Sequence, residues 1–489
     1  MLNWLLALLS AALLILTFPR FSIVWLAPFA IAPLLLAVAR EPNWKKRFLL
    51  GWVAGIVYWF GVCYWIQFVL AFHGGLGDVA GWAVFLLFAL AKGLHLGFFA
   101  IFAGMLMRRW WAIPTVAVLW VAIEVTHGSM GFAWLTLGNA AIDMSIPLRL
   151  APFTGVYGIS FMFALMSAAV AVAGLRRSRK ELFWLAPILL LPLLPEMPPI
   201  ERGRETALLV QPNLSETEQW TTESVERMKQ SLVMLTLRGA LSDPAQRPSI
   251  IVWPEVPAPF YYYDDPSFRN LIDNLARTTR AYLLIGIVAH TPGGGALNSA
   301  ALISPQGGSV SRYDKVNLVP FGEFVPWPFG FANKISTEVG DFVAGKRVVV
   351  SPVGDRQVGT FICYESVFPN FVRKFAAEGA EVLFNISNDG WFGKSAAREQ
   401  HLSMVRMRAA ENRRWILRAT NDGITATIDS AGRIRGRVPL FVAAASTTGF
   451  SYIAEQTVYT RWGDWFALLC AAVALMGLVA DSVVPHFGR

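Results

Sequence analysis

Apolar residues dominate the first 196 positions of the chain, and only short polar loops interrupt them. A helix needs about 20 consecutive apolar residues to cross a bilayer. The pattern therefore predicts seven spans before residue 197 and one more near the C-terminus. The expected ranges are 3–18, 21–39, 48–72, 80–107, 111–126, 155–174, 181–196 and 465–485. Together they predict a multi-span α-helical membrane bundle.

One stretch inside this apolar part, residues 127–154, does not have the pattern of a clean span. The interrupting residues are Gly128, Gly131, Gly138, Asp143, Pro147 and Pro152. We expect a re-entrant or interfacial segment here, because irregular backbone is tolerated at membrane depth where protein covers it.

Residues 197–464 follow a different pattern, in which short strand-like runs alternate with helical ones. The predicted strands are 206–211, 249–253, 282–289, 297–303, 357–363, 381–386, 414–420 and 424–428. The predicted helices are 217–240, 266–279, 367–378 and 396–412, and hairpin turns are predicted at 306–308 and 430–432. This alternation indicates a layered α/β domain. The chain thus divides into a membrane bundle (1–196), an α/β domain (197–464) and a closing span (465–489).

Basic residues in the short loops predict how the bundle is oriented. One set of alternate loops holds ten Lys and Arg residues, at 40–47, 108–109 and 176–180, and the other set holds two, Arg20 and Arg149. Positively charged loops stay in the cytoplasm. The N-terminus is therefore expected inside and the α/β domain outside, facing the periplasm.

Composition agrees with a membrane protein, since 55% of the residues are hydrophobic and only 15% are charged. The net charge of +9 does not indicate nucleic-acid binding, because many basic residues lie in the loops between spans. The six histidines show no ligand spacing, so no metal site or cofactor is predicted. Two of the three cysteines lie in apolar spans, which leaves Cys363 as the single cysteine of the α/β domain.

Three polar side chains each lie at or just after the end of a predicted strand: Glu255, Lys315 and Cys363. Reactive groups gather at the carboxyl ends of strands in α/β sheets. Glu255 can act as general base, Lys315 can stabilise an oxyanion, and Cys363 can act as nucleophile once it is activated. The plainer alternative is a small buried cysteine with a solvated glutamate and lysine elsewhere.

The order Glu255, Lys315, Cys363 resembles the nitrilase superfamily, and five runs narrow the resemblance to the apolipoprotein N-acyltransferases. The runs are DK (314–315) followed by NLVPFGEFVP (317–326), ICYE (362–365), SNDGWFG (387–393), RMRA (406–409) and TNDGIT (420–425). The resemblance implies an αββα sandwich. It also implies transfer of an acyl chain from a phospholipid, through a cysteine thioester, to the amine of a diacylglyceryl-cysteine on bacterial apolipoproteins.

Carried over residue by residue, the resemblance makes Glu255, Lys315 and Cys363 the catalytic triad of an inner-membrane enzyme. Supporting or substrate-binding roles fall to Trp220, Glu323, Tyr364 and Glu365. The expected partners are the phospholipid donor, the diacylated acceptor and the bilayer, and we expect a monomer. Two departures are Gly390, where a larger small residue is expected, and the segment at Glu124, which lacks a basic neighbour.

Some features leave alternatives open. The long loop 320–346 is rich in proline and aromatic residues, so Phe324 and Trp327 are expected to contact lipid as part of a lid, or else to form a small core. Lys92 lies within a predicted span, either as a functional charge or as a side chain that reaches water or a carbonyl. Rival functions are a membrane-anchored amidase or lipid hydrolase, and a lipid transporter with an outer binding module.

Overall fold

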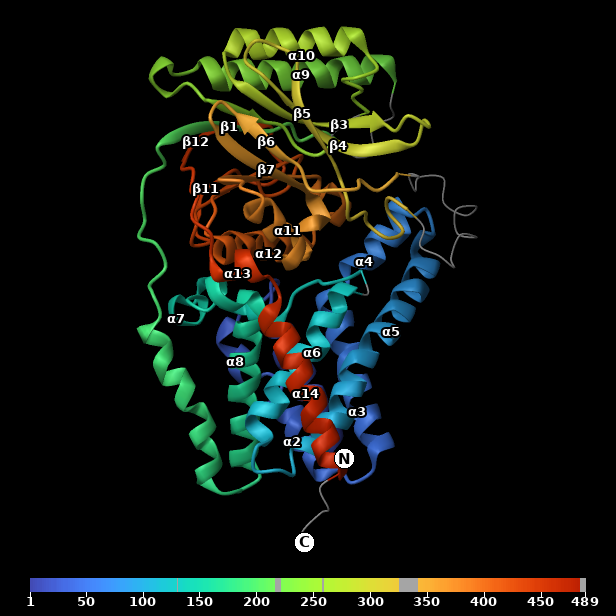
Figure 1. Cartoon of the computed structure of the whole chain (residues 1–489). Coiled ribbons are helices and arrows are strands. Elements are labelled where there is room, and N and C mark those ends of the chain that lie inside the picture. The colour runs from blue at the N-terminus through green and yellow to red at the C-terminus, as the bar shows by residue number, and fades with distance from the viewer. Residues whose placement is uncertain (130, 216–220, 257–258, 325–341, 484–489) are drawn as a thin grey trace. The chain divides into compact units, whose positions relative to one another are not determined.

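The computed structural model describes residues 1–489 except 130, 216–220, 257–258, 325–341 and 484–489 (Figure 1). The chain divides into two compact units. The helical unit comprises 1–71, 77–197 and 462–489, and the α/β unit comprises 72–76 and 198–461. The helical unit thus takes its last segment from the C-terminal end of the chain.

The helical unit is built from apolar helices, with short 3-10 helices between them. Its elements are α1 (Leu2–Thr17), η1 (Val24–Phe29), α2 (Ala32–Arg40), α3 (Trp44–Val62), α4 (Trp65–Phe68), α5 (Gly77–Leu106), α6 (Ala112–Ser129), η3 (Leu137–Asp143), α7 (Ser145–Leu148), α8 (Ala151–Gly174), η4 (Arg179–Leu193) and α14 (Trp465–Val483). The π-helix η2 (Val69–His73) follows α4 and joins the two units.

Among the described residues, α5 and α8 are each long and apolar enough to cross a membrane. Residues Trp44–Val62 and Trp65–His73 would make a third span together, although they are bent by 62°. Shorter apolar helices cover Leu2–Thr17, Val24–Arg40, Ala112–Gly128 and Trp465–Ala480. Apolar helices thus occupy seven of the eight expected ranges, and the number of spans remains a prediction.

Prolines explain where the helices differ from the expected pattern. The expected span 21–39 is divided into η1 and α2, with Pro28 inside η1. The expected span 181–196 is the 3-10 helix η4, which contains Pro187 and Pro192. Proline has no backbone N–H and its ring clashes with the preceding turn, so it disrupts a regular α-helix.

Small residues allow α3 and α5 to pack closely. A Cβ atom added to Gly51 would lie 2.2 Å from the backbone oxygen of Leu96, and one added to Gly55 would lie 2.8 Å from the Cα atom of Gly93. Glycines at such contacts let two helix backbones approach, which is how helices associate in lipid.

The α/β unit contains two six-stranded sheets (Figure 1). The first has the order β12-β1-β2-β3-β4-β5 and the second β11-β10-β9-β8-β7-β6. The strands of the first sheet are β1 (Glu205–Gln211), β2 (Ile250–Val252), β3 (Tyr282–His290), β4 (Ala296–Ile303), β5 (Ser309–Asp314) and β12 (Ala444–Phe450). Those of the second are β6 (Val350–Val353), β7 (Arg356–Ile362), β8 (Val382–Ser387), β9 (Ile416–Thr420), β10 (Ala426–Ile428) and β11 (Ile434–Arg437).

Helices cover the outer faces of both sheets, which gives the expected αββα sandwich. α9 (Thr222–Leu241) and α10 (Pro266–Thr279) pack on the first sheet, and α11 (Pro369–Ala377) and α12 (Ala397–Asn412) on the second (Figure 1). Alternating residues of β1 serve the two faces: Leu208 joins the core beneath α9 and α10, and Leu209 joins the core shared with the second sheet. This two-sided burial explains why the strands are continuous apolar runs.

Candidate active site

Each of the three candidate catalytic residues follows a strand in the α/β unit. Glu255 lies just beyond β2, Lys315 follows β5 directly, and Cys363 follows β7 directly. β2 and β5 belong to the first sheet and β7 to the second. The Nζ atom of Lys315 lies 2.9 Å from Oε1 of Glu255, and both side chains interact electrostatically with the Cys363 thiol. The sandwich thus brings together residues that are far apart in sequence.

A second carboxylate and an amide complete the cluster around Lys315. Oε1 of Glu323 lies 3.0 Å from Lys315 Nζ. The Nδ2 atom of Asn298, on β4, donates to Oε1 of Glu255 at 2.8 Å and to Oε1 of Glu323 at 2.7 Å. Lys315 and Asn298 therefore bridge the same two carboxylate oxygens. All four side chains are at least 90% buried.

The hydrogen bonds within this cluster leave two groups available for chemistry. An ammonium group has three N–H donors, and Lys315 directs two of them to Glu255 and Glu323. Oε2 of Glu255 accepts one hydrogen bond, from the backbone N–H of Asn388 at 2.9 Å. A carboxylate oxygen can accept two, so Oε2 retains capacity for a proton and Lys315 retains a third N–H.

The charges of the cluster keep Lys315 protonated. Burial alone would lower the pKa of Lys315, but Glu255 and Glu323 raise it well above its usual value. Lys315 is therefore a cation at every pH at which the enzyme would work. A fixed cation beside a reacting carbonyl is suited to stabilise the negative charge of a tetrahedral intermediate.

Cys363 occupies a tight turn between β7 and the five-residue 3-10 helix η7 (Cys363–Val367). Its φ of +49° lies in the left-handed region, which costs a residue other than glycine about 1 kcal/mol or more. Burial, followed by the charge of Glu255, raises the pKa of the Cys363 thiol, whereas Lys315 and a hydrogen bond with Ser387 lower it. The resting nucleophile is therefore a thiol and needs a base to become reactive.

Glu365 holds the turn around Cys363 in place. Its Oε1 atom accepts hydrogen bonds from the Tyr313 hydroxyl at 2.7 Å, Val316 N–H at 2.8 Å and Asn317 N–H at 3.1 Å. Its Oε2 atom accepts one from Ile362 N–H at 2.7 Å. Burial raises the pKa of Glu365 to about 7, and these donors oppose the shift. Glu365 thus links the residue before Cys363 to the segment after Lys315.

A buried ionic network, which the sequence did not predict, lies beside Cys363. Arg418, on β9, donates from Nη2 to both carboxylate oxygens of Asp389, at 2.7 and 2.8 Å. Nδ1 of His401 lies 3.1 Å from Asp389, and Nε2 lies 3.1 Å from the backbone oxygen of Cys363. Burial would raise the pKa of Asp389, but Arg418 and His401 hold it well below its usual range. A charged arginine within an apolar strand was the available signal, because a buried charge requires a partner.

The other expected site residues are less informative. Tyr364 is buried, with its ring centroid 5.3 Å from that of Phe368. The backbone oxygen of Phe324 accepts a hydrogen bond from Phe321 N–H at 2.8 Å, and Phe324 is partly buried. Trp220 and Trp327 lie outside the described residues, so their expected contacts with substrate or lipid remain predictions.

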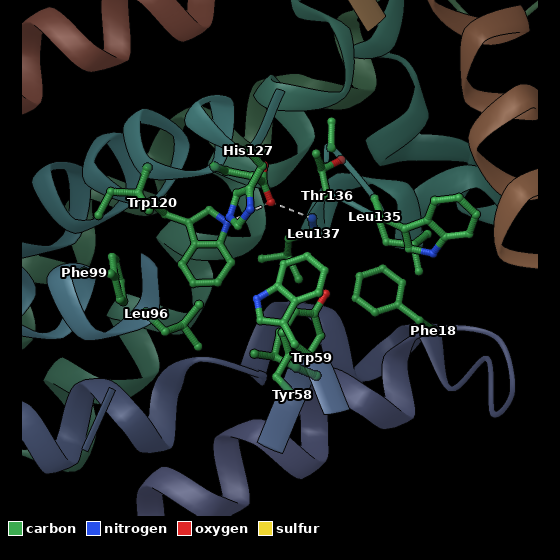
Figure 2. A pocket seen from close by; sticks show the side chains of 15 residues that line it. Phe18, Tyr58, Trp59, Leu96, Phe99, Trp120, His127, Leu135, Thr136 and Leu137 are labelled. Carbon is green, nitrogen blue, oxygen red and sulfur yellow. Dashed lines mark hydrogen bonds between the residues drawn. The ribbon is translucent and has the colours of Figure 1, made fainter. Parts of the chain in front are cut away.

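Within the helical unit, Glu124 and His127 line a cavity of about 40 Å³, which is space for a few water molecules, and Figure 2 shows His127 there. Glu124 and Lys92 are both buried. Lys92 Nζ lies 2.5 Å from Nδ1 of His127 and donates to the backbone oxygen of Phe132 at 3.1 Å. Oε1 of Glu124 accepts from Leu137 N–H at 2.7 Å. Lys92 thus reaches a carbonyl within the bundle, as one of the two alternatives expected.

Comparison with known proteins gives matches along most of the chain. Residues 10–169 match the family model of the apolipoprotein N-acyltransferase N-terminal domain, and residues 207–450 match that of carbon-nitrogen hydrolases. The apolipoprotein N-acyltransferase of Geobacter metallireducens is 34% identical over 96% of this chain and 94% of its own length. That of Pseudomonas putida is 30% identical over 98% and 97% of the two chains.

Among solved structures, Nit3 of Saccharomyces cerevisiae, a member of the nitrilase superfamily, aligns with 50% of this chain and 89% of its own. Its TM-score is 0.41 and the sequence identity is 16%. The curated relatives and the two family models confirm the resemblance that the five sequence runs indicated.

Proposed function

This chain belongs to the apolipoprotein N-acyltransferase family, and we propose on that basis that it transfers an acyl chain from a phospholipid to the N-terminal amine of diacylglyceryl-cysteine on apolipoproteins. The observation that carries the proposal is the pair of Lys315 and Glu255, 2.9 Å apart and in electrostatic contact with the Cys363 thiol. This arrangement supplies a base, a cation and a nucleophile for acyl transfer through a thioester.

In the first step, Oε2 of Glu255 accepts the proton of the Cys363 thiol, and the sulfur attacks the ester carbonyl of the phospholipid. The remaining N–H of Lys315 donates to the oxyanion that forms. When the tetrahedral intermediate collapses, the ester C–O bond breaks and the departing oxygen takes the proton from Glu255. The products are a lysophospholipid and a thioester on Cys363.

In the second step, the amine of the acceptor attacks the thioester carbonyl while Glu255 removes a proton from the nitrogen. Lys315 again stabilises the oxyanion. The C–S bond then breaks and the proton held by Glu255 returns to the sulfur, so the enzyme is regenerated. Separate steps suit two substrates that each carry bulky lipid, because the lysophospholipid leaves before the acceptor binds.

The competing function is hydrolysis, in which water replaces the amine in the second step. The same three residues would serve it, and the superfamily resemblance of the α/β unit is compatible with it. Membership of the family along both the helical and the α/β parts of the chain favours the transferase. A transporter with an outer binding module would leave the buried cluster of Glu255, Lys315 and Cys363 without a role.

A single-turnover experiment tests the proposal. Purified full-length enzyme is mixed with phospholipid that carries a labelled acyl chain, without acceptor. We expect lysophospholipid in an amount equal to the enzyme and an acyl adduct on Cys363 by mass spectrometry. Addition of a diacylglyceryl-cysteine peptide should move the label to its amine. Lysophospholipid release that strictly requires acceptor would exclude this scheme, sustained release of fatty acid would indicate a hydrolase, and no release at all would leave the transporter.

Membrane location follows the family and the apolar helices. We further propose that the chain is a multi-pass protein of the bacterial inner membrane, acts as a monomer, and exposes residues 197–464 to the periplasm. The support for this orientation is the ten-to-two asymmetry of basic residues in the loops.

A further inference from the structure

Ser387 lies beside the nucleophile because of the strand register. β7 and β8 are parallel, and Ile362 pairs with Ile386. Cys363 directly follows Ile362 at the end of β7, and Ser387 is the residue after Ile386 on β8, so the register brings the two residues close together. Ser387 is completely buried, and its hydroxyl forms a hydrogen bond with the Cys363 thiol that lowers the thiol pKa.

The same hydroxyl has a second partner. Ser387 Oγ donates to Oδ1 of Asp389 at 3.0 Å. Asp389 is ionised, because Arg418 and His401 hold its pKa well below the usual range despite burial. An ionised carboxylate can only accept hydrogen bonds, and a serine hydroxyl has one proton to donate. The Ser387 proton therefore points either to Asp389 or to the sulfur of Cys363.

We propose that Ser387 is a catalytic residue whose hydroxyl turns from Asp389 to the Cys363 sulfur as the thiol becomes a thiolate. While Cys363 is a thiol, its S–H donates to Ser387 Oγ and the Ser387 O–H donates to Asp389. When the thiol proton passes to Glu255, the sulfur becomes an acceptor and the Ser387 O–H donates to it. Ser387 keeps its own proton throughout, so the step needs no further proton acceptor.

The hydrogen bonds around Asp389 keep the free-energy cost of rotating the Ser387 hydroxyl small. Asp389 loses one hydrogen bond but retains both from Arg418, at 2.7 and 2.8 Å. The carboxylate is thus fixed in place and still neutralised after the hydroxyl has turned. The hydrogen bond that Asp389 loses and the one that the thiolate gains are both to an ionised group, so the exchange is nearly balanced.

His401 is the other candidate for this role, but its ring faces the backbone. Nε2 lies 3.1 Å from the Cys363 carbonyl oxygen and 2.8 Å from Ser366 Oγ. Burial and the charge of Arg418 lower the pKa of His401, whereas Asp389 raises it. The Nε2 atom faces the Cys363 carbonyl and Ser366, and Nδ1 faces Asp389. His401 therefore positions the turn, whereas Ser387 contacts the reacting atom.

The test measures acyl-enzyme formation in the full-length enzyme, and it rests on the proposed function. The variants are Ser387→Ala and Ser387→Thr, which retains the hydroxyl and suits a strand. Thr279→Val is the control, because it removes a buried hydroxyl of α10 that bonds only within its own helix. Each enzyme is mixed with labelled phospholipid, without acceptor, and the rate of the lysophospholipid burst is followed from pH 6 to 10.

Loss of one hydrogen bond to an ionised group should slow the burst about 10- to 100-fold in Ser387→Ala. The loss should be similar from pH 6 to 10, because Glu255 takes the thiol proton within the same step. The charged groups that set the pH profile around the sulfur are Glu255, Lys315 and Asp389. Ser387→Thr should remain within about threefold of the parent enzyme, and Thr279→Val should match it.

A burst in Ser387→Ala equal to that of the parent enzyme overturns the proposal. A loss in Ser387→Thr as large as that in Ser387→Ala also overturns it, because the effect would then not depend on the hydroxyl. If Ser387→Ala does not fold, Ser387→Thr and Ser387→Val form a pair of equal shape that differs only in the hydroxyl. Equal burst rates in that pair would also overturn it. Failure of the proposed function is distinct, since the parent enzyme itself would then give no burst.

Discussion

The buried pair of Asp389 and Arg418 makes the most quantitative prediction, tested by Asp389→Asn. Both side chains are completely buried. Arg418 contacts both carboxylate oxygens of Asp389, and its Nε atom donates to the backbone oxygen of Ile424 at 3.2 Å. The variant preserves the shape of the side chain but removes its charge, and it turns an N–H group toward Arg418 or His401.

Removal of one partner from a buried ion pair costs about 3–5 kcal/mol, because the remaining charge is left without compensation. For a domain of this size, 1 kcal/mol lowers the melting temperature by roughly 2–4 °C. We therefore expect Asp389→Asn to melt roughly 6–20 °C below the parent. The steric counterpart is Gly423→Ala, because a Cβ atom there would lie 2.2 Å from Oδ2 of Asp389 and should displace the same carboxylate.

The pH dependence of the stability follows from the direction in which the Asp389 pKa is shifted. The pKa of Asp389 is lowered in the folded protein, so its contribution is present above the unfolded value of 3.8 and is lost as pH falls through the folded value. From pH 5 to 8 the carboxylate is ionised in both states. The difference in melting temperature between parent and variant should therefore be constant across that range.

The assay is thermal unfolding of full-length protein in detergent, followed by intrinsic fluorescence at pH 5, 6, 7 and 8. The control is Asp355→Asn, which removes an exposed carboxylate in the turn between β6 and β7 and should change the melting temperature by no more than about 2 °C. A similar small change in Asp389→Asn would refute the ion-pair argument. A difference that grew or shrank strongly between pH 5 and 8 would show that Asp389 or the neighbouring His401 changes its protonation in that range.

Three further predictions concern catalysis, topology and the loop after Lys315. Cys363→Ser should be nearly inactive, and Lys315→Ala should slow acyl-enzyme formation by about 100-fold or more. Both are measured as the lysophospholipid burst, and a burst near that of the parent enzyme contradicts the assigned roles. A reporter that works only in the cytoplasm should be silent when fused after Ser215, and activity there would reverse the proposed topology. Replacement of Phe324 and Trp327 by Ala should weaken use of phospholipid more than it lowers the melting temperature, and equal losses would favour a small core.

The sequence predicted those elements best that carry both an apolar pattern and a local start or stop signal. The helix predicted at 266–279 matches α10 (Pro266–Thr279) at both ends. Asp265 caps its first turn, Pro266 suits the first helical position, and Arg280 ends it in a left-handed conformation. The expected turns at 306–308 and 430–432 are also confirmed, since each joins two antiparallel strands.

Four strands were missed, β5, β6, β11 and β12, and each lies at the end of its sheet. β12 (Ala444–Phe450) has the sequence AASTTGF, and β11 (Ile434–Arg437) alternates Ile and Gly with Arg. Both lie at the ends of their sheets, where fewer side chains need to be apolar. Their pairing with β1 and β10 depends on contacts distant in sequence, which a local pattern does not contain.

The residues of the candidate site also divide into those that a local pattern predicted and those that it did not. Cys363 was recognisable because it ends a predicted strand and lies in a family run, and Glu255 and Lys315 because their order with Cys363 resembles the nitrilase superfamily. Asn298 was not, although an asparagine within the buried strand β4 was a sign that its amide had a specific partner. That partner proved to be the pair of carboxylates at Glu255 and Glu323, which only the folded sheet reveals.

The charges around Cys363 explain why the nucleophile depends on its base. Glu255 and Glu323 bring two negative charges to the cluster and Lys315 brings one positive charge. The net charge of −1 disfavours an additional negative charge on the sulfur. Protonation of Glu255 removes that excess and leaves Lys315 free to balance the thiolate. Transfer of the proton to Glu255 therefore creates the Cys363 thiolate and at the same time removes the negative charge that would destabilise it. The buried thiol is thus unreactive at rest and becomes a nucleophile only as its proton moves to Glu255.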